Sequence, residues 1–204
     1  MTPLVTLESR AVPLLRDNID TDAIIPSREM RSVSKDGLAD GLFAGWRYTA
    51  IGGREIDPTF VLNQPESKGA QILLGGSNFG CGSSREHAVW ALAEYGFRVV
   101  IAPSFSPIFQ GNCIRNGIAP IVLPREAVEQ IAAGFADGTP VTIDMPSCEV
   151  RMGLAVFPFS MEDEARTMLI EGADAIELTL RHRAEIEGFF ARDAAVRPWI
   201  YLAD

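Results

Sequence analysis

A segment rich in glycine and hydroxyl groups holds the residues of this sequence that are best suited to chemistry. It reads Gly75-Gly-Ser-Asn-Phe-Gly-Cys-Gly-Ser-Ser-Arg-Glu-His87. Glycines ahead of a helix let the backbone approach a ligand closely, and the free N–H groups of a first helical turn favour an anion. Ser83, Ser84 and Arg85 add two hydroxyls and a guanidinium, which together suit a carboxylate substrate. An ordinary capped helix after a glycine turn is the alternative, and this segment alone does not decide between the two.

The neighbouring sequence predicts a strand before this segment and a helix after it. The apolar run 71–75 is the strand, and apolar residues at helical spacing follow over 84–95. Ser83 and Glu86 fit the S-x-x-E capping box, which predicts where the helix begins. With a further strand at 98–102, these elements form a right-handed βαβ unit with parallel strands.

The rest of the chain continues the alternation of strands and helices. We predict strands at 11–15, 23–26 and 119–123, helices at 104–117 and 124–133, an antiparallel meander over 141–157 and a helical C-terminal segment at 161–192. The fold class is therefore α/β, with a mixed sheet and a parallel βαβ core. The chain shows no linker or internal repeat, so residues 1–204 are predicted to form a single domain.

Three aspartates lie within the run Asp17-Asn-Ile-Asp-Thr-Asp22 and raise the question of a calcium site. The EF-hand loop requires glycine at its sixth position and glutamate at its twelfth, but these positions hold Asp22 and Arg28. The motif therefore fails. Two interpretations stay open, an Asx-rich turn between two strands and a carboxylate at Asp22 that orients a catalytic group.

Residues 27–48 form the longest stretch without clean periodicity, and they include Arg28, Arg31 and Lys35. A loop of this length inside a compact domain is typically a lid or binding loop, or else a mobile segment.

Composition and charge argue against several classes of function. A formal charge of −9 does not fit a nucleic-acid-binding surface, which needs clustered basic residues. The cysteines at 81, 113 and 148 lack C-x-x-C spacing, so we expect no metal or cluster site in this chain. They suit a reducing compartment. The N-terminus lacks the apolar core of a signal peptide, and no apolar run approaches the ~20 residues of a membrane span, so we expect a cytoplasmic protein.

The segment Gly80-Cys-Gly-Ser-Ser-Arg-Glu-His87 resembles the signature of the swivelling domain of the aconitase superfamily. From about residue 14 to residue 180, the chain is similar to the small subunits of 3-isopropylmalate dehydratase (isopropylmalate isomerase). The stretches that carry this wider match are 17–26, 42–47, 78–79, 100–105, 109–112, Asn116 and 178–180.

This resemblance implies a three-layer β/β/α swivelling fold that works with a large subunit, as a heterodimer or a higher assembly. It also implies that the large subunit binds a [4Fe-4S] cluster through its own cysteines. The family reaction belongs to leucine biosynthesis and isomerises 2-isopropylmalate and 3-isopropylmalate by dehydration and rehydration, through an enzyme-bound maleate derivative. The open iron of the cluster serves as Lewis acid for the departing hydroxyl.

The resemblance further implies roles for individual residues. Ser83 is the catalytic base, acting as an alkoxide, while Ser84 and Arg85 hold a substrate carboxylate. Such an alkoxide needs helix-start N–H groups and a cation to stabilise its charge in a site closed to water. Ser83 cannot both cap its helix and serve as a free base. Asp22, with Thr21, lies at the mouth of the site and orients a histidine of the large subunit.

By the same resemblance, a flexible loop at 27–41 recognises the substrate, with Lys35 and Arg31 as its candidate cations. Family members often have an arginine near position 35, so the lysine leaves both the contacting cation and the substrate open. One alternative is a related hydro-lyase that acts on citraconate and 2-methylmalate, or on dimethylmaleate. The other is a non-catalytic module that binds a carboxylate or RNA, and the charge of −9 weighs against RNA.

Overall fold

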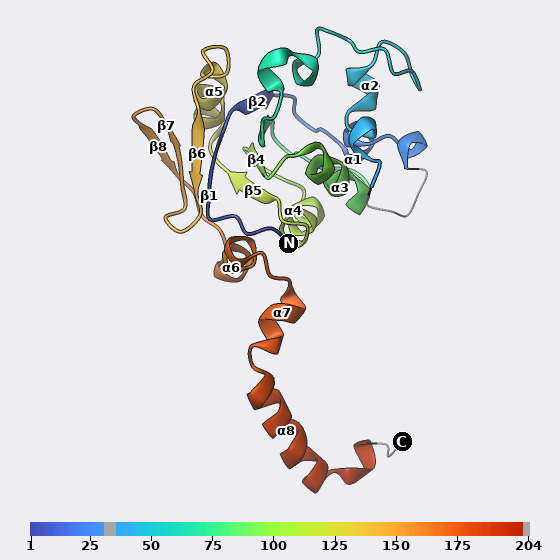
Figure 1. The fold of residues 1–204 in the computed structure, drawn as a ribbon, viewed down its shortest axis with the longest axis vertical. Helices are drawn as coiled ribbons and strands as arrows, with labels where there is room; N and C mark the ends of the chain where they lie inside the picture. Colours follow the sequence, from blue (N-terminus) through green and yellow to red (C-terminus); the bar gives the residue numbers. More distant parts are fainter. Residues whose placement is uncertain (31–35, 202–204) are drawn as a thin grey trace. The chain divides into compact units, whose positions relative to one another are not determined.

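The computed structural model describes residues 1–30 and 36–201, and its strands form a parallel and an antiparallel sheet (Figure 1). The parallel sheet has the order β2 (Ala11–Leu14), β3 (Ile72–Gly75), β4 (Val99–Ala102) and β5 (Ala119–Val122). The antiparallel sheet has the order β1 (Thr6–Ser9), β6 (Val141–Asp144), β7 (Glu149–Met152) and β8 (Ala155–Pro158). The predicted α/β class with a parallel core is confirmed, and the two kinds of pairing lie in separate sheets.

The parallel sheet is the middle layer of the fold. Successive residues of a strand point to opposite faces, so each parallel strand contributes to two cores. Leu73 and Val100 belong to a core shared with helices, whereas Ile72 and Val99 belong to a core shared with the antiparallel sheet. The helices packed around these cores are α1 (Thr21–Ile24), α2 (Ala44–Arg47), α3 (Glu86–Tyr95), α4 (Pro107–Arg115), α5 (Arg125–Ala133) and α6 (Asp163–Glu171). The layers therefore follow the β/β/α order that the resemblance implies.

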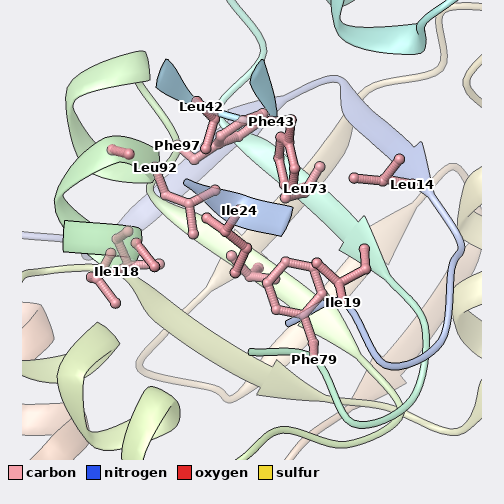
Figure 2. Close-up of a cluster of buried hydrophobic side chains, with 14 of the residues drawn as sticks. Leu14, Ile19, Ile24, Leu42, Phe43, Leu73, Phe79, Leu92, Phe97 and Ile118 are labelled. Carbon is pink, nitrogen blue, oxygen red and sulfur yellow. The ribbon is translucent and has the colours of Figure 1, made fainter. Parts of the chain in front are cut away.

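The core on the helical face fixes the elements that carry the candidate site (Figure 2). Ile24 of α1 and Leu92 of α3 are fully buried in it, beside Leu73 of the parallel sheet. Full burial of one such side chain stabilises the fold by about 1.5–3 kcal/mol. Helices α1 and α3 are therefore held against the same sheet.

Two elements differ from the prediction because polar side chains bind the backbone. The strand expected at 23–26 is wrong, since the Asp20 side chain accepts a hydrogen bond from the Ala23 N–H at 2.6 Å and caps helix α1 instead. The helix expected from residue 104 begins at Pro107. The Ser104 hydroxyl oxygen accepts a hydrogen bond from the Asn78 N–H at 2.8 Å and is not a helix cap.

By its internal contacts the chain divides into two compact units, 1–172 and 173–204. In the second unit, α7 (Ala175–Leu180) begins with a capping box between Asp174 and Glu177, and α8 (Arg183–Val196) follows. No residue of these two described helices is buried. One domain over residues 1–204 stays a prediction. No helix in the described part of the chain is long and apolar enough to cross a membrane.

Candidate active site

Residues 80–85, the serine turn, lie beside the aspartate-rich segment 17–22. The backbone of Asp20 pairs with that of Cys81, and the Thr21 N–H donates to the Cys81 carbonyl oxygen at 2.9 Å. The Gly80 N–H donates to the Ile19 carbonyl oxygen at 2.8 Å. Both segments follow parallel strands, and open parallel sheets place ligands beyond the carboxyl ends of their strands.

Thr21 is a buried residue that binds the backbone of the serine turn. It is only 2% exposed, and its hydroxyl donates to the Ser83 carbonyl oxygen at 2.9 Å. The two residues are 62 positions apart in the sequence, so this bond fixes the turn to a distant part of the chain. Thr21 thereby holds the Ser83 backbone in place, and its predicted contact with substrate stays a prediction.

Arg85 and Asp22 form an ion pair at the edge of the turn. Nη1 of Arg85 donates to Oδ1 of Asp22, and the two side chains are 24% and 56% exposed. A guanidinium has five N–H donors, and in the described structure the others have no partner. Arg85 therefore keeps donors for a carboxylate ligand while Asp22 holds it in position.

The predicted capping box at Ser83 and Glu86 is wrong. Helix α3 begins at Glu86 with Arg85 as its N-cap residue, and no side chain caps it in the described structure. The Glu86 carboxylate instead accepts a hydrogen bond from Asn116 Nδ2 at 3.3 Å. Ser83 and Ser84 are exposed and precede the N-cap. The conflict between capping and acting as a base therefore disappears. The Ala88 N–H donates to the Arg85 carbonyl oxygen at 3.2 Å, and the N–H groups of Glu86 and His87 are left to attract an anion.

Gly80 allows the backbone of the serine turn to pack closely against Phe109 of helix α4. Its φ of +73° lies in the left-handed region, and a Cβ atom there would overlap the ring of Phe109, which is 2% exposed. We predict that Gly80→Ala lowers the free energy of unfolding by about 2–5 kcal/mol, from backbone strain and overpacking together. Gly52→Ala is the matched control, because Gly52 has a φ of +76° and no atom near its absent Cβ. Urea unfolding measures both, and equal losses would contradict the close approach to Phe109.

A small pocket opens at the serine turn, with a volume of about 10 Å³, roughly the space of one water molecule. It is lined by Thr21, Gly80, Gly82, Ser83, Ser84, Arg85, Ser106, Ile108, Phe109 and Asn112. The last four belong to α4 or its N-cap, and their role at the site was missed by sequence reasoning. Hollows of about 560 and 550 Å³ lie elsewhere and include none of the serine turn. The pocket at the serine turn is thus much smaller than these two hollows.

Both ends of loop 27–41 are anchored by carboxylates in the described structure. Glu94 of α3 accepts hydrogen bonds from the N–H groups of Gly37, Leu38 and Ala39 at 2.6, 2.5 and 2.8 Å. Partial burial acts to raise the pKa of the Glu94 carboxyl, but these donors outweigh it and hold that pKa below its ordinary value. At the other end, Arg54 Nη2 lies 2.6 Å from a Glu29 carboxylate oxygen.

Two of the predicted substrate-binding cations, Arg31 and Lys35, lie outside the described residues. Their predicted contacts with substrate stay predictions.

Comparison with known proteins shows the family of this chain. The family model of the aconitase C-terminal domain matches residues 1–126. A 3-isopropylmalate dehydratase small subunit from Cupriavidus necator is 54% identical over 206 residues, which cover 99% of each chain. A protein of the same name from Acidothermus cellulolyticus is 50% identical over 97% of this chain and 98% of its own. The chain belongs to the 3-isopropylmalate dehydratase small subunits.

The fold of this dehydratase family member also has a solved counterpart. The structure of a 3-isopropylmalate dehydratase (leuD) from Methanocaldococcus jannaschii matches with a TM-score of 0.65 and 29% sequence identity. The match covers 90% of this chain and 98% of the other. The resemblance drawn from the serine turn and the wider sequence is confirmed.

The side chains of this dehydratase subunit do not fit an iron–sulfur cluster. Thiolates are the ligands of such clusters, and burial raises the pKa of the Cys113 thiol far above its ordinary value. Cys81 and Cys148 are free and partly buried. In the described part of the chain, no group of three or more His, Cys, Asp or Glu residues could hold a metal ion.

Proposed function

We propose that this chain supplies one half of a 3-isopropylmalate dehydratase active site, which a large subunit completes. The complex would isomerise 2-isopropylmalate and 3-isopropylmalate in leucine biosynthesis. The observation that carries the proposal is the serine turn, where exposed Ser83 and Ser84 stand beside the Arg85–Asp22 ion pair at an uncapped helix start. These groups bind a carboxylate and accept a proton.

Ser83 is the base in this proposal. Its Oγ, as an alkoxide, takes a proton from the carbon next to a substrate carboxylate while the neighbouring carbon loses its hydroxyl as hydroxide. The C–H electron pair becomes the double bond of the bound maleate derivative. Return of the proton and hydroxide to the opposite carbons gives the isomer. The first-turn N–H groups of α3 and the guanidinium of Arg85 stabilise the alkoxide once the large subunit excludes water.

Arg85 and Ser84 hold the substrate carboxylate next to the reacting carbon. The guanidinium offers parallel N–H donors to the two carboxylate oxygens, and the Ser84 hydroxyl adds a third. Asp22 keeps the guanidinium in place and presents its exposed carboxylate to a histidine of the large subunit. The loop 27–41, anchored through Glu94 and Glu29, recognises the remainder of the substrate.

The partner and the cofactor follow from the same proposal. A [4Fe-4S] cluster in the large subunit would supply the Lewis acid for the leaving hydroxyl, while the residues of this chain bind the carboxylate and move the proton. The names of the relatives, all small subunits, support the partner. The described cysteines are free, which suits a reducing compartment such as the cytoplasm.

Steady-state kinetics of the reconstituted complex test which acid is the preferred substrate. We expect kcat/KM for 3-isopropylmalate to exceed that for citraconate by at least about 100-fold, because a site shaped for an isopropyl group loses that burial with the smaller acid. Negligible turnover of isopropylmalate beside fast hydration of citraconate would assign the chain to the related hydro-lyases instead.

A further inference from the structure

Helix α4 carries one buried polar side chain that the proposed mechanism leaves without a role. Asn112 is 5% exposed and lines the same small pocket as Ser83, Ser84 and Arg85. Asn112 Nδ2 is not among the described buried side-chain atoms that lack a hydrogen-bond partner, so an open donor of this amide keeps access to the pocket and its solvent. A polar group of a ligand in the pocket can take the place of that water.

The orientation of the Asn112 amide is set by its neighbour on the helix. Nη2 of Arg115, three residues further along, donates to Oδ1 of Asn112, so the oxygen end is identified by its donor. In the described part of the chain, no atom accepts a hydrogen bond from Asn112 Nδ2. The amide nitrogen is thus the end that can donate to a ligand in the pocket, and it carries two N–H donors.

We propose that Asn112 is a further substrate-binding residue, whose Nδ2 donates a hydrogen bond to the carboxylate held by the serine turn. The inference rests on the proposed function and deepens it. The pocket volume of about 10 Å³ admits one oxygen-sized group, which fits a single carboxylate oxygen and not a larger part of the substrate. Asn112 belongs to α4 and Arg85 is the N-cap residue of α3, so the carboxylate is bound from two helices.

The first test is Asn112→Asp in the reconstituted complex. Aspartate keeps the shape and the acceptor for Arg115, but it replaces the donor with a negative charge. We expect kcat/KM for 3-isopropylmalate to fall by about 100-fold, and the Kd of 2-isopropylsuccinate, the substrate without its hydroxyl, to rise by a similar factor. Asn112→Ala removes the donor without adding charge, and we expect a rise in that Kd of about tenfold.

Gln110→Glu is the matched control for charge. It makes the same change on the same helix, but Gln110 lines the separate hollow between α4 and α6. We expect both constants to stay within about threefold of wild type. If kcat/KM and Kd of Asn112→Asp and Asn112→Ala both stay within threefold of wild type, the proposal is overturned. It is also overturned if Gln110→Glu changes these two constants as much as Asn112→Asp does.

The two proposals fail in different ways. If the wild-type complex binds 2-isopropylsuccinate but does not turn over isopropylmalate, the proposed function is wrong, while the Kd series still decides the role of Asn112. A purely structural role would lower the thermal midpoint of the variants and leave the Kd of the folded complex unchanged, and that result would also overturn the proposal.

Discussion

Replacing Ser83 with alanine is expected to lower the kcat of the reconstituted enzyme by a factor on the order of 10²–10⁴. A positioned general base contributes about this much, and the proposed mechanism gives that role to Ser83. Ser83 is exposed, so the free energy of unfolding should change by less than about 0.5 kcal/mol. Initial rates at saturating 3-isopropylmalate measure the effect.

Ser84→Ala is the control that separates proton transfer from binding. It deletes the same hydroxyl one residue further along, and it removes one hydrogen bond to a charged carboxylate. We expect kcat/KM to fall by about tenfold, mainly through a higher KM. A Ser83→Ala complex that retains kcat within threefold of wild type would show that the base lies elsewhere.

Arg85→Gln is expected to lower kcat/KM by about 10²–10³-fold. The substitution removes the charge and the paired N–H donors that bind the carboxylate, and truncation of a buried charged partner costs about 2–5 kcal/mol. Arg85→Lys keeps the charge but loses the planar fork, so it should recover only part of the activity. Asp22 is more than half exposed, so loss of its ion pair with Arg85 alone costs at most about 1 kcal/mol of stability.

The ion pair between Arg125 and Asp17 offers a matched control. Its atoms lie 2.7 Å apart, both side chains are partly exposed, and neither residue lines the pocket of the serine turn. Arg125→Gln changes the net charge by the same amount and should leave kcat/KM within about threefold of wild type. Equal losses in Arg85→Gln and Arg125→Gln would mean that long-range charge, and not carboxylate binding, accounts for the effect.

The parts of the fold that depend on apolar pattern could be predicted from the sequence. The apolar residues of β3 and β4 are buried on both faces, so each reads as a continuous apolar run between polar boundaries. The antiparallel meander shows the alternation expected of strands with one buried face, as in β6. These signals are local, and they placed the serine turn between a strand and a helix.

The errors arose where a distant contact outweighs a local preference. The spacing of Ser83 and Glu86 favours a capping box, but Thr21, 62 residues away, binds the Ser83 carbonyl and holds that residue outside the helix. Ile24 and Ile25 favour a strand by their branched side chains, yet the Asp20 cap makes residues 21–24 a helical turn.

Two groups near the site could be recognised only in three dimensions. Glu94 anchors Leu38 across 56 residues, and no sequence spacing indicates that contact. Asn112 occurs in a stretch that supports the family resemblance, but only the fold shows that its amide lines the pocket beside Ser83.

If the serine turn is half of an active site, this chain must complete the site of a large subunit. The measurement is the initial rate of 3-isopropylmalate isomerisation when this chain is added in increasing ratio to a fixed amount of cluster-loaded large subunit. We expect no rate without this chain, no rate from this chain alone, and a rise that saturates at a fixed stoichiometric ratio. A large subunit that reaches the saturated rate by itself would show that the serine turn is not needed for the reaction.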